Sequence, residues 1–191
     1  MRGKLITIYG INNIGKSYHA KRLVQRLKKA GKKAMYIKYP IYDLAPTGPA
    51  LNKILRSHTQ TMSEEELQLL FVLNRYHFQP KLESYLARGY TVVAEDYVGT
   101  GLAWGIAKGG NPRELHKMNE HLLKEDQAIL MTGERSLHAK EAGHIHETQD
   151  ELVQKCSHVL KKLAKEFRWT VIERAAEKEV TEQKIWRALL K

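Results

Sequence analysis

Residues 10–17 read Gly10-Ile11-Asn12-Asn13-Ile14-Gly15-Lys16-Ser17, which fits the pattern G-x-x-x-x-G-K-[ST] of a phosphate-binding loop. In such loops the glycines let backbone N–H groups turn inward around phosphate oxygens, and the N-terminus of the following helix adds positive potential. The lysine reaches the β- and γ-phosphates, and the serine hydroxyl is a ligand for Mg²⁺. These eight residues therefore predict a site for a nucleoside triphosphate and Mg²⁺.

The segments on either side of the loop have the sequences that this motif requires. Leu5–Tyr9 is a short apolar, β-branched run typical of a buried strand. After the loop, apolar residues recur at helical spacing as far as Ala30, and Gly31 is a typical helix stop. Strand, glycine loop and helix thus follow in the expected order, which argues against a chance match in a turn rich in Gly and Asn.

Length and composition indicate a single domain over residues 1–191. No run of about eighteen apolar residues occurs, so no transmembrane helix is expected. Because the first predicted strand begins within a few residues of Met1, no signal peptide is expected. Cys156 is the only cysteine, which favours a reducing, cytoplasmic location, and its apolar neighbours at helical spacing predict a packed core thiol.

The chain has a net charge of +11, from 32 basic and 21 acidic residues. The basic residues are spread along the chain in short pairs, such as Lys28-Lys29 and Lys161-Lys162, with no dense tract that alternates with aromatic residues. Because nucleotides are polyanions, a nucleotide-binding protein also has reason to be basic. We therefore expect small nucleotides as ligands, and neither nucleic acid nor a membrane as a partner.

Further strands and helices are expected along the rest of the chain. Apolar runs predict strands at Lys33–Lys38, Tyr90–Ala94, Ala128–Met131 and Trp169–Ile172. Helices are expected at Pro49–Arg56, from the capping box Ser63–Glu66 to about Ala87 with a kink or restart at Pro80, at Pro112–Lys124, at about Thr148–Glu166 and at Thr181–Leu190. Ile41–Gly48 is expected to be a loop, and Gly99–Gly110 a glycine-dotted segment.

This alternation of strands and helices predicts an α/β fold, a five-stranded parallel sheet with helices on both faces. Ligands bind such sheets at the carboxyl ends of the strands, where Gly10, Pro40, Glu95 and Gly133 all fall. The polar segment from about residue 133 to 147 lacks an apolar stripe and is expected to form a short mobile lid. Two of its three histidines, His144 and His146, are poorly spaced for a helical zinc site and are interpreted as polar lid residues.

Phosphoryl transfer depends mainly on positioning and on neutralising charge, and the candidate catalytic residues match those needs. Lys16 and Ser17 come from the loop. Glu95 directly follows the third predicted strand, where P-loop enzymes have an acidic residue near the metal ion. The alternative for Glu95 is a role as a helix cap or in an ion pair. Arg75 is either a substrate ligand or a solvated helix residue. Arg135 is expected to neutralise developing charge from the lid.

Taken together, these motifs resemble the thymidylate kinases, P-loop nucleoside monophosphate kinases that phosphorylate dTMP with Mg-ATP. The resemblance covers nearly the whole chain and implies the three-layer P-loop NTPase fold. The matching pieces are the loop Gly10–Ser17, Tyr39-Pro40-Ile41-Tyr42, Leu70-Phe71-Val72-Leu73-Asn74-Arg75, Glu95-Asp96-Tyr97, Leu102-Ala103-Trp104 and Gly133-Glu134-Arg135-Ser136.

The resemblance implies a role for each matched position. Phe71 would stack on the thymine ring and Arg75 would hold its edge, while Pro40 and Tyr42 would line the monophosphate side. Trp104 stands where the family usually has a tyrosine beside the sugar. Asp96, Tyr97 and Gly101 complete the implied acceptor site, with ATP on Gly10–Ser17 and Mg²⁺ on Ser17 and Glu95. A lid-type catalytic arginine is implied, with Arg135 and Lys140 as donors.

Three departures from the family pattern matter most, two of them at single positions and one in the lid segment. Where the family has an arginine that binds the acceptor's phosphate, this chain has Asp96. A carboxylate beside a phosphate costs free energy unless a metal ion bridges the two. The loop aspartate typical of the family is Asn12, and the segment 133–147 is poorer in arginine than the usual lid. These departures concern the acceptor more than the ATP donor.

The resemblance implies an ATP-dependent dTMP kinase of nucleotide biosynthesis, commonly a homodimer. Two alternatives stay open at this point. A deoxynucleoside kinase of related fold would phosphorylate a 5′-hydroxyl, with Asp96 or Glu95 as general base. A nucleotide-binding protein with little turnover is the other, although it would have no need for the complete set of Lys16, Ser17 and Glu95.

Overall fold

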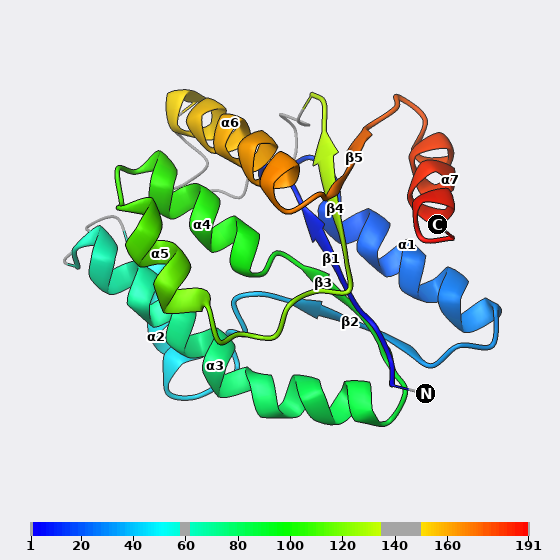
Figure 1. Ribbon diagram of the computed structural model, residues 1–191, viewed down its shortest axis with the longest axis horizontal. Helices are drawn as coiled ribbons and strands as arrows, with labels where there is room; N and C mark the ends of the chain where they lie inside the picture. Colours follow the sequence, from blue (N-terminus) through cyan, green and yellow to red (C-terminus); the bar gives the residue numbers. More distant parts are fainter. Residues whose placement is uncertain (1, 58–61, 135–149, 191) are drawn as a thin grey trace.

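The computed structural model describes residues 2–57, 62–134 and 150–190 (Figure 1). Five parallel strands form one sheet in the order β2-β3-β1-β4-β5, which confirms the predicted fold class. The strands are β1 (Leu5–Tyr9), β2 (Ala34–Lys38), β3 (Thr91–Glu95), β4 (Gln127–Thr132) and β5 (Thr170–Glu173). The helices are α1 (Lys16–Lys29), α2 (Thr47–Leu55), α3 (Glu64–Ala87), α4 (Val98–Ala107), α5 (Pro112–Asn119), α6 (Asp150–Glu166) and α7 (Lys178–Ala188).

Helices cover both faces of the sheet, α1 and α7 on one side and α3 to α6 on the other (Figure 1). The central strand β1 is buried throughout, and its alternate residues enter two apolar cores. Leu5 and Tyr9 join the core beneath α3, α4 and α6, whereas Ile6 and Ile8 join the core beneath α1 and α7. A strand that is buried on both faces consists of a continuous run of apolar residues, and this strand was therefore predictable from the sequence.

Cys156 on α6 is buried in the first of these cores, as expected for a packed thiol. Burial raises the pKa of the Cys156 thiol to about 12, so it is unreactive at neutral pH. In the described part of the chain, no helix is both long enough and apolar enough to cross a bilayer.

The glycine-dotted segment after β3 is a helix, α4, contrary to the sequence-based expectation. Its glycines lie where a side chain would collide with a neighbour. A Cβ at Gly99 would lie 2.3 Å from the Trp169 ring, and one at Gly105 would lie 2.8 Å from Leu115. The glycines therefore allow close packing of this helix, and buried contacts outweigh their low helix propensity.

Other boundaries also differ from those expected. α3 continues through Pro80 as one helix, so the expected restart there is wrong. α2 begins at Thr47 and α7 at Lys178, earlier than predicted, and α5 ends at Asn119, well before Lys124. The capping box at Ser63 is present as expected, with reciprocal bonds to Glu66.

Asn74, fully buried on α3, fixes the loop that follows β2. Its Oδ1 accepts from the Ile41 N–H at 2.8 Å, and its Nδ2 donates to the Ile41 carbonyl and to Thr47 Oγ1 at 3.0 and 2.9 Å. Asn74→Ala is expected to lower the free energy of unfolding by about 2 kcal/mol or more, because buried loop groups lose their partners.

Chemical denaturation would measure this loss. The control is Asn52→Ala on α2, which removes only an exposed bond from Arg56 Nε and should change stability by less than about 0.5 kcal/mol. Equal effects of the two substitutions would contradict the role assigned to Asn74.

Candidate functional site

A cavity of about 700 Å³ opens at the carboxyl ends of β1, β2 and β3. The segments that follow these three strands line it, together with one face of α3, part of α4 and the chain around β5 and α7. This is the edge of the sheet where ligands are expected to bind in a parallel α/β fold.

The phosphate-binding loop lies between β1 and α1, with Gly15 as the N-terminal cap of the helix. Gly10, Asn13 and Gly15 have φ angles of 150°, 64° and 99°, conformations that glycine adopts freely and asparagine tolerates. The Lys16 side chain curls back over the loop, and its Nζ donates to the carbonyls of Gly10 and Ile11 at 2.9 and 3.0 Å. The ammonium is therefore buried and held at the centre of the loop.

Glu95 and Ser17 form a cluster of oxygen atoms beside this ammonium. Ser17 Oγ donates to Glu95 Oε1 at 2.7 Å, Lys38 Nζ lies 3.5 Å from the same oxygen, and the Tyr36 hydroxyl donates to Oε2. Burial and the Glu95 carboxylate raise the pKa of Tyr36 well above its usual value, so this phenol stays a donor. A hydroxyl and a carboxylate oxygen in contact are the ligands that Mg²⁺ prefers, so these residues fit the ion.

Asp96 faces the same ammonium from the other side. Its Oδ1 accepts from Thr100 Oγ1 at 2.7 Å and lies 3.7 Å from Lys16 Nζ. Burial raises the pKa of Asp96 even though Lys16 acts to lower it. The residue has a φ of 59°, a left-handed conformation that aspartate tolerates better than most side chains. A carboxylate therefore lies within the cavity, next to the predicted triphosphate site.

Arg75 is buried and lines the cavity, so the alternative of a solvated helix residue is wrong. Its Nη1 donates to Asn119 Oδ1 at 3.1 Å. A Cβ at Gly101 would lie 2.4 Å from Arg75 Nη2, so the glycine leaves room for the guanidinium. Burial lowers the pKa of Arg75, yet arginine keeps its charge in proteins.

Three buried polar atoms near the guanidinium lack a hydrogen-bond partner among the residues that the structure describes. They are Arg75 Nε and the hydroxyls of Tyr39 and Tyr97. All three residues line the cavity. Because buried polar groups are nearly always paired, these atoms are candidates to bind a polar ligand.

Most of the predicted site residues line this one cavity. They are Asn12, Asn13, Gly15, Lys16, Ser17, Pro40, Tyr42, Phe71, Arg75, Glu95, Asp96, Tyr97, Gly101 and Trp104. Of the other loop residues, Ile14 is fully buried in the core and Ile11 borders a separate, smaller cavity. Arg135, Lys140, His144 and His146 lie outside the described residues, as does most of the predicted lid.

Sequence reasoning missed several residues of the cavity. Arg174 and Lys178 come from the chain between β5 and α7, and Gln68 and Thr100 from α3 and α4. Arg174 directly follows the fifth strand, so the rule that ligands bind at carboxyl ends could have identified it. Tyr36 lies within β2, and no sequence pattern connects it to Glu95.

Comparisons with known proteins agree with this arrangement. The profile of the family described as "Thymidylate kinase" matches residues 8–185. The thymidylate kinase of Nitrosospira multiformis is 31% identical over 180 residues, which cover 87% of this chain and 86% of that protein. The human thymidylate kinase is 29% identical over 170 residues, 84% of this chain and 78% of the human protein.

A solved structure shares the fold. The structure of thymidylate kinase from Candida albicans superimposes with a TM-score of 0.79, at 22% identity, over 99% of this chain and 92% of that one. At this identity the likeness concerns the fold alone, and it agrees with the five-stranded parallel sheet described above.

Proposed function

The chain belongs to the thymidylate kinase family, and from that premise we propose that it transfers the γ-phosphoryl group of Mg-ATP to dTMP, giving ADP and dTDP. One observation carries the proposal. The phosphate-binding loop and the Ser17–Glu95 pair share a single cavity with Arg75 and Phe71. A triphosphate and a nucleotide acceptor can therefore meet within it, which is the geometric need of phosphoryl transfer.

On the donor side, the loop backbone and Lys16 would hold the β- and γ-phosphates of ATP. Ser17 and Glu95 would hold Mg²⁺, which neutralises charge on the phosphate oxygens when bound. Lys16 already lies at the loop centre through the Gly10 and Ile11 carbonyls, so it needs little rearrangement to reach a phosphate. Positioned charge of this kind is usually the largest contribution to catalysis.

On the acceptor side, the ring of Phe71 and the guanidinium of Arg75 would hold the thymine base, with Trp104 beside the deoxyribose. Pro40 and Tyr42 would border the monophosphate. Lys38 would carry the charge that the family's arginine supplies, because its Nζ lies 3.5 Å from Glu95 at the edge of the cavity. Asp96 would be tolerated through its contacts with Lys16 and Thr100.

The charge that develops on the transferred group would be neutralised by Arg135 from the lid. Arg174 and Lys178 border the same cavity and add positive charge on the side of the phosphate-binding loop. The electrostatic field in the cavity depends on the charges and their distances, and not on which element supplies them. Arg174 and Lys178 would therefore compensate for the small number of arginines in the lid segment.

A second candidate, a deoxynucleoside kinase, is favoured by the position of Asp96. A carboxylate near the transferred phosphate could accept the proton of a 5′-hydroxyl, a chemistry that a monophosphate acceptor does not need. The family membership and the shared cavity favour dTMP.

A coupled ADP-release assay with Mg-ATP tests the proposal. The acceptors compared are dTMP, dUMP, thymidine and deoxycytidine, with a reaction lacking acceptor as the blank. The expected result is turnover on dTMP well above thymidine. Turnover on a nucleoside but not on dTMP would move the chain to the second candidate, and no turnover above the blank would contradict both.

Phe71→Ala is expected to raise the KM for dTMP by about tenfold or more, because stacking of a base on an aromatic ring is lost. The KM for ATP should stay within about twofold, since the loop that binds the triphosphate is unchanged. Phe71→Tyr keeps the ring and is the matched control. A larger change in the KM for ATP than for dTMP would contradict the assignment of Phe71 to the acceptor.

A further inference from the structure

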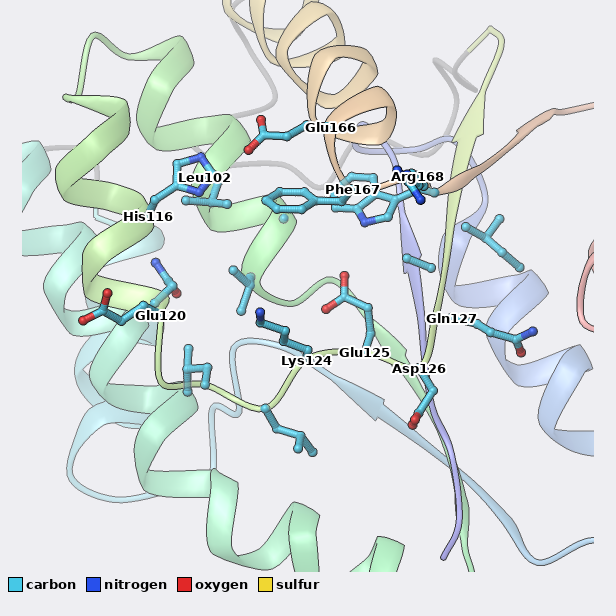
Figure 2. Close-up of a pocket in the computed structure, with 18 of the residues that line it drawn as sticks. Leu102, His116, Glu120, Lys124, Glu125, Asp126, Gln127, Glu166, Phe167 and Arg168 are labelled. Atoms are coloured by element: carbon cyan, nitrogen blue, oxygen red, sulfur yellow. The ribbon is translucent and has the colours of Figure 1, made fainter.

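A second cavity, of about 920 Å³, lies beside the amino-terminal ends of β4 and β5 (Figure 2). Helix α4 separates it from the first cavity. Val98, Gly99 and Leu102 of this helix line the second cavity, whereas Thr100, Gly101 and Trp104 line the first. Among the described residues, no side chain lines both cavities. The kinase reaction proposed above makes no use of this space.

The rings of His116, Phe167 and Trp169 line the second cavity, and the buried ring of Tyr9 stacks on Trp169 without lining it. The Tyr9 and Trp169 rings are stacked with centroids 4.3 Å apart, and Trp169 stacks with Phe167 at 5.8 Å. The ring centroid of His116 lies 5.8 Å from that of Phe167, and both side chains are labelled in Figure 2. Trp169 is buried, but Phe167 is 45% exposed, a large fraction for a phenylalanine in contact with a core. The Phe167 ring therefore remains available for a planar ligand to stack on.

Glu125 brings a carboxylate to the same cavity. Figure 2 shows its side chain pointing into the space beneath the Phe167 ring. Its Oε1 accepts from the Tyr9 hydroxyl at 3.0 Å. No cationic side chain within residues 2–57, 62–134 and 150–190 lies within 4.0 Å of it, and burial raises the pKa of the carboxyl group. A largely buried carboxylate without a cation is costly, so it favours a ligand that donates hydrogen bonds.

We propose that this cavity binds a planar nitrogen heterocycle of the guanine type, stacked on Phe167 and donating adjacent N–H groups to the Glu125 carboxylate. Guanine offers two neighbouring donors, N1–H and the 2-amino group, and a carboxylate is an acceptor for both. An alkyl ammonium would satisfy the carboxylate but leave the ring unused. A simple aromatic hydrocarbon would use the ring but leave the carboxylate unpaired.

The size and the rim of the cavity agree with such a ligand. Its volume falls within the range of small-molecule sites, about 300–1,000 Å³. Side chains of both charges line the cavity, so its charge does not favour a ligand that carries a phosphate group. The basic residues are Arg113, Lys117, Lys124 and Arg168, and the acidic ones are Glu120, Asp126 and Glu166. A nucleoside is therefore the appropriate probe.

Guanosine binding to the full chain, measured by isothermal titration calorimetry without ATP or dTMP, tests the inference. Guanosine has no phosphate, so the loop at Gly10–Ser17 contributes little to its binding. Inosine lacks the 2-amino group and should bind about tenfold more weakly. Glu125→Gln removes the charge with little change in shape and should weaken guanosine binding by about tenfold or more.

Two further variants separate this cavity from the first. Phe167→Ala, at an exposed ring, should weaken guanosine binding by about tenfold through lost stacking. Phe71→Ala alters only the acceptor side of the first cavity and should leave the dissociation constant within about twofold. Thermal melting checks that each variant is folded.

The guanosine titrations and the kinase assay can fail independently of each other. Failure of the unmodified chain to bind guanosine would overturn the inference and leave the proposed kinase activity untouched. Binding that Phe71→Ala abolishes and Glu125→Gln spares would assign guanosine to the first cavity, and it would overturn the inference as well. Equal affinity for guanosine and inosine would contradict the role of the 2-amino group and of Glu125.

Discussion

Lys16→Ala is expected to lower kcat with Mg-ATP and dTMP by about a hundredfold or more, the usual effect of losing one positioned charge donor. The ammonium is buried at the centre of the loop, where the Gly10 and Ile11 carbonyls hold it at 2.9 and 3.0 Å. A triphosphate would meet this charge without reorganisation of the loop. Since the charge acts on the transferred group, kcat should fall more than the affinity for dTMP.

The matched control is Lys28→Ala, which removes an exposed lysine from the last turn of the same helix. It should leave kcat within about twofold, because its charge is far from the loop and screened by solvent. Thermal melting of the Lys16 variant should show a folded protein, with at most about 1–3 kcal/mol lost for the two unpaired carbonyls. Near-normal turnover of a folded Lys16 variant would contradict the assignment of this loop to ATP.

The strands were predictable from the sequence because β1, β3 and β4 lie inside the sheet, are largely buried and therefore consist of apolar runs. Leu5–Tyr9 is the same segment in the prediction and in the structure, and the other strands differ by one residue at an end or at both ends. β5 has the weakest signal, since Val171 is exposed at 53% and only Ile172 of the strand is buried. An apolar run bounded by turns is a local property, and it needs no knowledge of the partner strands.

The helices with unusual residues were not predictable in the same way. Gly99, Gly101 and Gly105 lower the helix propensity of α4. These glycines are required by tertiary packing, because each lies against a ring or side chain from a distant segment of the chain. Pro80 interrupts the hydrogen-bond pattern of α3, yet packing of Phe78 and Leu82 in the core holds the helix on both sides of it.

The candidate site was predictable where its residues follow a strand. Lys16 and Asp96 follow strands, Glu95 is the last residue of β3, and all three line one cavity. Tyr36 and Asn119 could not be identified, because their roles depend on contacts with residues 59 and 44 positions away. The second cavity has no sequence signal at all, since the residues that line it, such as Leu102, Glu125 and Phe167, come from separate segments of the chain.

Asp96→Arg is expected to lower the KM for dTMP by about tenfold or more, because arginine binds a phosphate with two charge-assisted hydrogen bonds. The substitution also removes a carboxylate that lies 3.7 Å from Lys16 Nζ and would repel the acceptor's dianion. The left-handed backbone at this residue, with a φ of 59°, costs the arginine about 1–2 kcal/mol of stability. Steady-state kinetics at saturating Mg-ATP would measure the change.

Two neutral substitutions separate the local effect from the change in net charge. Asp96→Asn keeps the shape and an oxygen that can accept from Thr100, and it should lower the KM for dTMP by a smaller factor than Asp96→Arg. Asp43→Asn makes the same charge change at an exposed residue that does not line the cavity, and it should leave the KM within about twofold. A higher KM in both Asp96 variants would mean that the carboxylate has a partner in the acceptor complex.

Asp96→Asn also separates the two candidate reactions. If the acceptor is a 5′-hydroxyl and Asp96 accepts its proton, turnover on thymidine should fall by about a hundredfold or more, since amides do not act as general bases. If the acceptor is dTMP, its phosphate oxygen is already ionised, and kcat should stay within a few-fold while the KM falls. The same variant therefore changes kcat in one mechanism and KM in the other, which makes Asp96 the residue that decides between them.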